Sequence, residues 1–254
     1  MRELLALTRE LKARLEVPCA DRWRTAPMGA RSLEGGRSPL PEGAAPAEAP
    51  APAPAAEKAA ALAALRAEVE ACRRCPLGSQ RLHPAFGTGS PDAAVLFIGE
   101  GPGFEEDRRA EPFVGRAGQL LDKILAAISL SRLGTTAADG AYIANVVKCH
   151  PMKDPSDPEK RGNDRPPTAP EMEACRGYLD EQIRIVRPRF LVALGGTAAK
   201  ALLGTQEGIS RLRGRWQEYR SIPLLPTYHP AALLRDPGLK RDVWNDMKML
   251  RDRL

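Results

Sequence analysis

Four short β-rich runs alternate with helical stretches along most of the chain, and this alternation most constrains the fold. The runs read "AAVLFIGE" (93–100), "AYIANVVK" (141–148), "RFLVALGG" (189–196) and "IPLLPTYHP" (222–230). Helical patterns cover residues 117–130, 168–186, 197–204 and 241–254. A strand that is followed repeatedly by a helix predicts an α/β fold, with a mostly parallel sheet and helices on both faces.

Polar residues and glycines stand where the predicted strands end. They are Glu100, Asn145, Gly195–Gly196 and His229. Because ligands of open α/β sheets gather at the carboxyl ends of parallel strands, we expect these positions to border the functional site.

The first part of the chain has a different composition. Pro41–Ala56 reads "PEGAAPAEAPAPAPAA", which predicts an extended linker. Before it, leucines recur at helical spacing and predict a short amphipathic helix, which either packs on the body or docks on a partner (Leu4, Leu7, Leu11 and Leu15). We therefore divide the chain into an N-terminal helix with a disordered linker, 1–57, and one folded domain, 58–254.

Composition narrows the cellular setting. The chain has 254 residues, 43% of them hydrophobic, and no apolar run near the ~20 residues that a membrane span needs. The charged start lacks the apolar core of a signal peptide, so we expect a cytoplasmic protein without a membrane partner. The net charge of +6 favours an anionic partner such as nucleic acid.

Five cysteines carry a specific signal. "CRRC" places Cys72 and Cys75 on a turn, and Cys149 and Cys175 follow far along the chain, whereas Cys19 has no evident role. Four thiolates can surround one metal centre, and spacing alone fits either zinc or an iron–sulfur cluster. Buried free thiols are the simpler alternative, but "CRRC" favours metal binding.

The stretch from Gly99 to Leu121, "GEGPGFEEDRRAEPFVGRAGQLL", fits several kinds of site. A phosphate-binding P-loop is excluded because no lysine follows the glycines. A dinucleotide fingerprint is disfavoured because Pro102 interrupts the turn and three acids would repel a pyrophosphate. A dinuclear metal site lacks nearby histidines. The remaining reading is a turn that presents backbone N–H groups and the Glu100 carboxylate, with the Phe113 ring behind it.

These residues together suit a base-binding pocket. The ring of Phe113 can stack on a base, and the carboxamide of Asn145 matches the O4/N3 edge of uracil. His229 can donate a hydrogen bond to the oxygen that gains charge as a base leaves, and Glu100 can position water. Each residue alone has an ordinary structural explanation, so their joint position at strand ends carries the argument.

The chain resembles the family-four uracil-DNA glycosylases, the iron–sulfur type. The resemblance runs in order from about residue 60 to 250, and its motifs are "CRRCPL", "GEGPGFEED", "PFVGRAGQLLDKIL", "YIANVVKCHP", "APEMEACRGYL", "LVALGGTAAKALLG" and "YHPAALLR". It implies a three-layer α/β/α sandwich with a central, mostly parallel, four-stranded sheet. It also implies a [4Fe-4S] cluster on Cys72, Cys75, Cys149 and Cys175.

The resemblance also implies roles for the site residues. Glu100 and His229 would be catalytic, with Glu100 at the water and His229 at the departing anion. Gly99, Gly101, Glu106, Phe113 and Asn145 would bind uracil, with Glu106 close to where thymine carries its methyl group. Leu233, Leu234 and Arg235 would form the wedge that fills the gap left by the flipped base.

The implied function is a monofunctional uracil-DNA glycosylase of base excision repair, acting as a monomer on single- or double-stranded DNA. No catalytic lysine is evident, so we expect an abasic site without strand cleavage. The segment between Cys149 and Cys175 is longer than is usual in the family. Relatives that trap the abasic sugar carry a histidine there, whereas Lys160–Asp164 has none. The alternatives are such a trapping protein, with His150 as its only candidate, and a non-catalytic iron–sulfur module that binds nucleic acid.

Overall fold

The computed structural model describes residues 54–254, and the predicted N-terminal helix, most of the linker and Cys19 lie outside this range. The first described element is helix α2 (Ala55–Ala71), so Ala55 and Ala56 of the predicted linker belong to a helix. Among the described residues no helix is long and apolar enough to cross a membrane.

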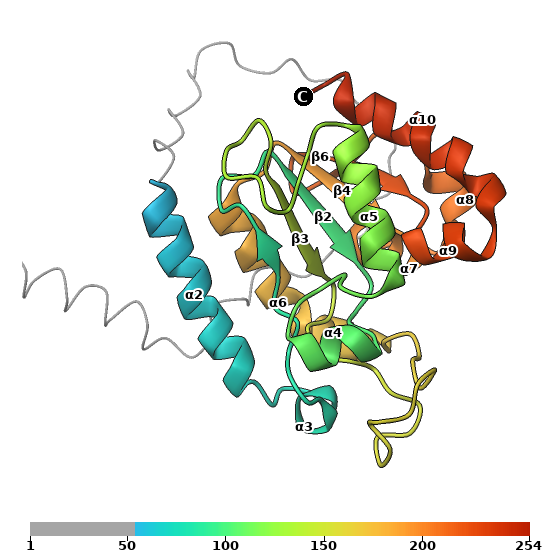
Figure 1. Cartoon of the computed structure of the whole chain (residues 1–254). Coiled ribbons are helices and arrows are strands. Elements are labelled where there is room, and N and C mark those ends of the chain that lie inside the picture. The colour runs from blue at the N-terminus through green and yellow to red at the C-terminus, as the bar shows by residue number, and fades with distance from the viewer. Residues whose placement is uncertain (1–53) are drawn as a thin grey trace, which may run out of the picture. The chain divides into compact units, whose positions relative to one another are not determined.

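The centre of the fold is a six-stranded sheet in the order β1-β3-β2-β4-β6-β5 (Figure 1). Its four inner strands run parallel and are the four predicted ones: β2 (Val95–Gly99), β3 (Ala141–Asn145), β4 (Phe190–Leu194) and β6 (Ile222–Thr227). The prediction of four strands missed two short edge strands, β1 (Thr88–Gly89) and β5 (Gln217–Tyr219), which pair antiparallel with β3 and β6. Strands of two or three residues leave little periodic signal in a sequence.

Helices cover both faces of the sheet, so the predicted three-layer α/β/α arrangement is confirmed (Figure 1). One layer contains α2, α6 (Ala169–Val186), α7 (Gly196–Leu203) and α8 (Ile209–Leu212). The other contains α5 (Arg116–Ala127), α9 (Pro230–Arg235) and α10 (Lys240–Arg251). Short helices α3 (Leu77–Gln80), α4 (Phe104–Arg109) and the 3-10 turn η1 (Pro237–Leu239) complete the chain.

Alternation along the inner strands explains why both faces are covered. Leu96 and Ile98 of β2 pack with the α2 and α6 layer, whereas Val95 and Phe97 pack with the α5 and α10 layer. All four side chains are buried, because successive residues of a strand point to opposite faces.

The Asp246 carboxylate attaches helix α10 both to the loop after α8 and to the end of β6. The Asp246 carboxylate is 1% exposed, binds the Arg213 guanidinium with an N–O distance of 2.6 Å, and accepts a hydrogen bond of 2.6 Å from the Thr227 hydroxyl. Thr227 ends β6, two residues before His229, so its hydrogen bond to Asp246 fixes the strand end that leads into the site.

We expect Asp246→Ala to lower the free energy of unfolding by about 2 kcal/mol, because Arg213 keeps only the more distant carboxylate of Asp242, at 3.7 Å, and the buried Thr227 hydroxyl loses its acceptor. Urea unfolding followed by circular dichroism measures the change. Asp252→Ala, which removes only an exposed ion pair with Arg251, is the control and should change it by less than about 0.5 kcal/mol. Equal effects of the two variants would contradict the assignment.

Candidate active site

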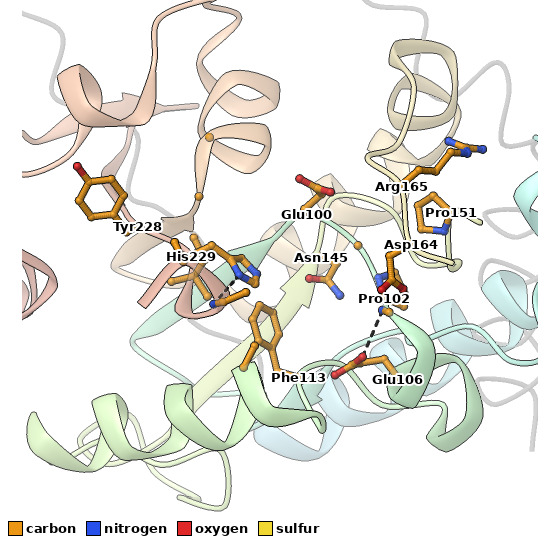
Figure 2. A pocket seen from close by; sticks show the side chains of 18 of the residues that line it. Glu100, Pro102, Glu106, Phe113, Asn145, Pro151, Asp164, Arg165, Tyr228 and His229 are labelled. Atoms are coloured by element: carbon orange, nitrogen blue, oxygen red, sulfur yellow. Dashed lines mark hydrogen bonds between the residues drawn. The ribbon is translucent and has the colours of Figure 1, made fainter. Parts of the chain in front are cut away.

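A cavity of about 560 Å³ opens at the carboxyl ends of the parallel strands. Seven of the predicted site residues line it, in agreement with the strand-end argument: Glu100, Gly101, Glu106, Phe113, Asn145, His229 and Arg235. Figure 2 shows Glu100, Asn145, Phe113 and His229 around one space, although they come from four different segments of the chain. The cavity is therefore a tertiary feature built by parallel strand pairing.

Asn145 places a buried polar side chain in the cavity wall. It ends β3, opposite Gly99 of β2, and is 1% exposed. Its side-chain oxygen has no hydrogen-bond partner within the described residues. A buried polar atom without a partner costs free energy, so its retention indicates a ligand that supplies a donor.

Glycine at position 99 makes room for the two pocket groups. A Cβ atom there would lie 2.4 Å from Asn145 Oδ1 and 2.5 Å from Phe113 Cζ, both far inside contact distance. Gly99 thus affects the pocket through the space that its missing side chain leaves for Asn145 and Phe113, and it does not line the cavity itself.

Phe113 adopts an uncommon backbone conformation. Its φ is +56°, and the ring is 6% exposed with its centroid 5.4 Å from that of His229. Such a conformation costs on the order of 1–3 kcal/mol in a residue other than glycine. Arg132 offsets this cost by donating hydrogen bonds of 2.9 Å to the carbonyls of Pro112 and Phe113. Gly118 leaves space for the Phe113 carbonyl, which a Cβ atom would meet at 1.7 Å.

Arg132 was missed by the sequence reasoning. It lies in the loop after α5, and its side chain is 9% exposed because ion pairs with Asp122 and Glu111 hold it inward. No motif marks an arginine whose target is a backbone carbonyl about 20 residues earlier in the chain, so only the structure reveals it.

His229 is held as a neutral imidazole. Burial, together with the positive charge of Arg235, lowers its pKa to about 4. Nδ1 accepts a hydrogen bond of 3.1 Å from the Ala231 backbone amide, which leaves the proton on Nε2. The ring can therefore donate one hydrogen bond from Nε2 at neutral pH. Gly195, with φ +94°, allows the close approach, since a Cβ atom there would lie 2.9 Å from His229 Cβ.

Glu106 lines the cavity, but backbone amides hold both of its carboxylate oxygens. Oε2 accepts from Gly103, and Oε1 accepts from Val114 and Gly115, at 2.9–3.2 Å. The carboxylate thus joins the Gly/Pro turn to the segment that carries Phe113. The predicted proximity to a thymine methyl group stays a prediction.

The wedge residues do not share one environment. Leu233 is 2% exposed and packs in the core beneath α9, so it is not available for insertion into DNA. Leu234 is 42% exposed and Arg235 is also exposed. The segment is helical, with Pro230 in the first turn of α9. A helix places adjacent residues about 100° apart, which separates the two leucines.

The long segment after Cys149 forms an ordered wall of the cavity. Asp164 and Arg165 line the cavity, and neither was predicted there. Asp164 binds His150 Nε2 at 2.7 Å, and the Arg165 guanidinium binds both oxygens of Glu171 at the start of α6. The segment thus contributes to the pocket.

The same segment is fastened to α4. Arg161 pairs with Glu105 at 2.9 Å, and Arg108 pairs with Glu159. The Phe104 ring lies between the two guanidinium groups, which are 3.5 Å and 4.7 Å from its centroid. Phe104 therefore serves as the stacking surface for this attachment.

The four predicted cysteines meet around one small cavity on the α2 and α6 side. Cys72 and Cys75 come from the turn after α2, Cys149 follows β3, and Cys175 lies in α6. Burial raises the pKa of Cys149 against the opposing effect of Arg81, whose Nη1 donates to its sulfur at 2.8 Å. Burial likewise raises the pKa of Cys175, to about 12.

The thiols do not close on a single ion. Within residues 54–254 no three histidine, cysteine or acidic side chains lie close enough to hold one metal ion. The all-sulfur donor set of the four cysteines fits an iron–sulfur cluster and equally fits zinc.

Comparison with known proteins agrees with this architecture. The family model described as the uracil DNA glycosylase superfamily matches residues 86–248. The chain belongs to this superfamily. It is 39% identical over 189 residues to a type-4 uracil-DNA glycosylase of Pyrobaculum aerophilum, covering 71% of this chain and 88% of that protein. It is 36% identical over 196 residues to the type-4 uracil-DNA glycosylase of Sulfurisphaera tokodaii, covering 74% and 82%. Membership of the type-4 group, which the motifs predicted, is thereby confirmed.

Similarity to the type-5 group is lower. A type-5 uracil-DNA glycosylase of Pyrobaculum aerophilum is 30% identical over 189 residues, covering 70% of this chain and 78% of that protein. The same organism thus offers a type-4 relative at 39% and a type-5 relative at 30% identity over equal lengths.

The neutral state of His229 gives a spectroscopic prediction. The chain has three histidines, so three imidazole signals are expected in a long-range ¹H–¹⁵N spectrum. We expect His229 to show the Nε2–H tautomer at pH 6 and to titrate near pH 4. His150, whose pKa is raised to about 9 by Asp107 and Asp164 in spite of its burial, should stay protonated there. A midpoint for His229 close to 6.5 would contradict the assignment.

Proposed function

We propose that the chain is a monofunctional uracil-DNA glycosylase, which extrudes uracil from DNA and hydrolyses its N-glycosidic bond. The observation that carries the proposal is the buried, unpartnered side-chain oxygen of Asn145 beside the Phe113 ring. Uracil offers an N3–H donor for that oxygen and a flat face for the ring. The printed names of the type-4 relatives support the same activity.

The remaining cavity residues supply the chemistry. As the bond between the sugar and N1 breaks, its electron pair stays on uracil, and the Nε2–H of His229 stabilises the developing charge on the base oxygen. A neutral imidazole acts here by hydrogen bonding and does not transfer its proton. Glu100 positions a water molecule that adds to the cationic sugar carbon, and the water proton neutralises the departing base. The product is an abasic site.

The cavity lining agrees with a single activity. Its lining by residues 54–254 contains no lysine, the usual residue for a Schiff base with the sugar, which supports base excision without strand cleavage. Leu234, which is exposed on α9, is the candidate for filling the gap in the duplex, and Arg235, which lines the cavity, is the candidate for contacting phosphate. Uracil-containing DNA, single- or double-stranded, is the proposed substrate, and a cytoplasmic monomer the proposed state.

We also propose a [4Fe-4S] cluster on Cys72, Cys75, Cys149 and Cys175. Its support is the convergence of exactly the predicted four thiols on one cavity, with Arg81 bonded to one of them. The cluster lies apart from the catalytic cavity, since none of its ligands lines that cavity. Its proposed role is structural, because it would join α2, the turn after β3 and α6.

Incubation of the protein with a uracil-containing oligonucleotide, followed by alkali, should break the strand at the uracil position. Asn145→Ala and His229→Ala should each lower kcat/KM by about 100-fold or more, because each removes a group aimed at the departing base. Asp252→Ala, on the exposed end of α10, is the folded control. Intact strands in every sample, with binding retained, would instead favour the non-catalytic nucleic-acid-binding module.

We expect no covalent DNA adduct. His150, the only histidine near the long segment, is fully buried between Asp107 and Asp164 and does not line the cavity. Asp164 occupies the cavity wall in its vicinity, with its carboxylate bound to that histidine. A denaturing gel of the protein with uracil-containing DNA should show free protein alone. A shifted band that survives denaturation would establish the trapping alternative.

A further inference from the structure

Lys148 is a fully buried cation without a carboxylate partner. It is 0% exposed, and its Nζ donates to Asn145 O at 2.7 Å and to Gln182 Oε1 at 2.6 Å. Both acceptors are neutral. Within residues 54–254 no carboxylate lies at ion-pair distance from this ammonium group. A buried charge without an opposite charge costs several kcal/mol, so a counter-charge is expected nearby.

The other buried lysine shows the usual solution. Lys58 is 7% exposed, and its Nζ lies 2.8 Å from the carboxylate of Asp92. The acid that acts on Lys148 through space is Asp180, whose carboxylate is already held by the Tyr219 hydroxyl and the Arg220 guanidinium at 2.5–2.6 Å. It therefore does not serve Lys148 as a direct partner.

The cysteine cavity supplies the missing charge. Lys148 lines this cavity together with all four cysteines. Cys149 is its neighbour in the chain, and Cys175 lines the same cavity from α6. Four thiolates around a cluster leave net negative charge in a buried place. Among residues 54–254, the cationic side chains of the cavity lining are those of Arg74, Arg81 and Lys148.

One side chain thus contacts both functional regions. Lys148 lines the cysteine cavity, and its ammonium group donates a hydrogen bond to the main-chain carbonyl of Asn145. The side chain of Asn145 lines the catalytic cavity. The bend from Asn145 to Cys149 is only five residues long, so displacement of one end reaches the other.

We infer that Lys148 is a positioning residue, which neutralises the four-thiolate site and by the same contact fixes Asn145 for base recognition. The inference rests on the proposed cluster and on the proposed glycosylase activity. It goes beyond both, because it gives the cluster a defined structural effect on the catalytic cavity through a single cation.

The test compares three variants of the full chain with the wild-type protein. Lys148→Met removes both the charge and the hydrogen bond to Asn145. Lys148→Gln removes the charge but keeps a side-chain N–H. Lys58→Met removes a buried lysine that touches neither site and controls for general destabilisation. The measurements are iron and acid-labile sulfide per chain, the reduction potential of the cluster, and the inhibition constant of free uracil.

We expect the reduction potential to become more negative in both Lys148 variants, because the added electron loses a nearby positive charge. We expect Lys148→Met to weaken uracil inhibition by about tenfold, the lower end of typical effects for outer-shell partners, and to lower kcat more than it raises KM. Lys148→Gln should show a smaller change in uracil inhibition. Lys58→Met should leave the potential and the inhibition constant at their wild-type values.

Wild-type potential in Lys148→Gln, or unchanged uracil inhibition in folded Lys148→Met, would overturn the inference. If Lys148→Met does not fold, the potential of Lys148→Gln still decides the charge effect. Failure of the underlying proposals looks different. If the wild-type protein contains no iron, the cluster assignment is wrong. If it contains iron but does not excise uracil, the proposed activity is wrong.

Discussion

Parallel pairing of the four inner strands is the constraint on which the rest of the structure depends. The register sets Gly99 opposite Asn145 and Leu194 opposite Thr227, so the chain leaves all four strands at one edge of the sheet. The segments that follow then supply Glu100, Asn145 and His229 to one cavity. A shift of one residue in any pair would turn the strand-end side chains to the opposite face of the sheet.

Residues around the cavity hold its side chains in their positions and protonation states. Gly99 omits a side chain that would overlap Asn145 and Phe113. Arg132 holds the backbone of Phe113 in a conformation that the residue would otherwise avoid. Burial keeps the His229 imidazole neutral while the Ala231 amide selects its tautomer. The uncommon Phe113 backbone and the burial of His229 lower local stability. The buried core and contacts such as the Asp246 ion pair offset this loss.

Two attachments frame the cavity from outside. The long segment after Cys149 is fastened to α4 through paired charges and the Phe104 ring, and it brings Asp164 and Arg165 to the wall. On the other side of the bend that begins at Asn145, the four cysteines gather around their own cavity. Lys148 lies between the two regions, which makes the bend after β3 the most heavily constrained connection of the site.

The sequence by itself determined the α/β class, the four inner strands and the helices α5, α6, α7 and α10, since their hydrophobic periodicity is strong and local, but it did not predict α2. Its motifs also identified the type-4 group, the four cysteines that meet and seven of the residues that line the cavity. The two edge strands were out of reach, because two or three residues carry no reliable period.

Only the tertiary structure decided which side chains are available and what holds them. Leu233 is buried and Leu234 is exposed, because adjacent residues of a helix point in different directions and only one face of α9 packs against the core. It revealed Arg132, Asp164 and Lys148, whose partners lie at main-chain carbonyls or on other segments. Such contacts depend on distances between segments remote in sequence, and a linear pattern does not record those distances.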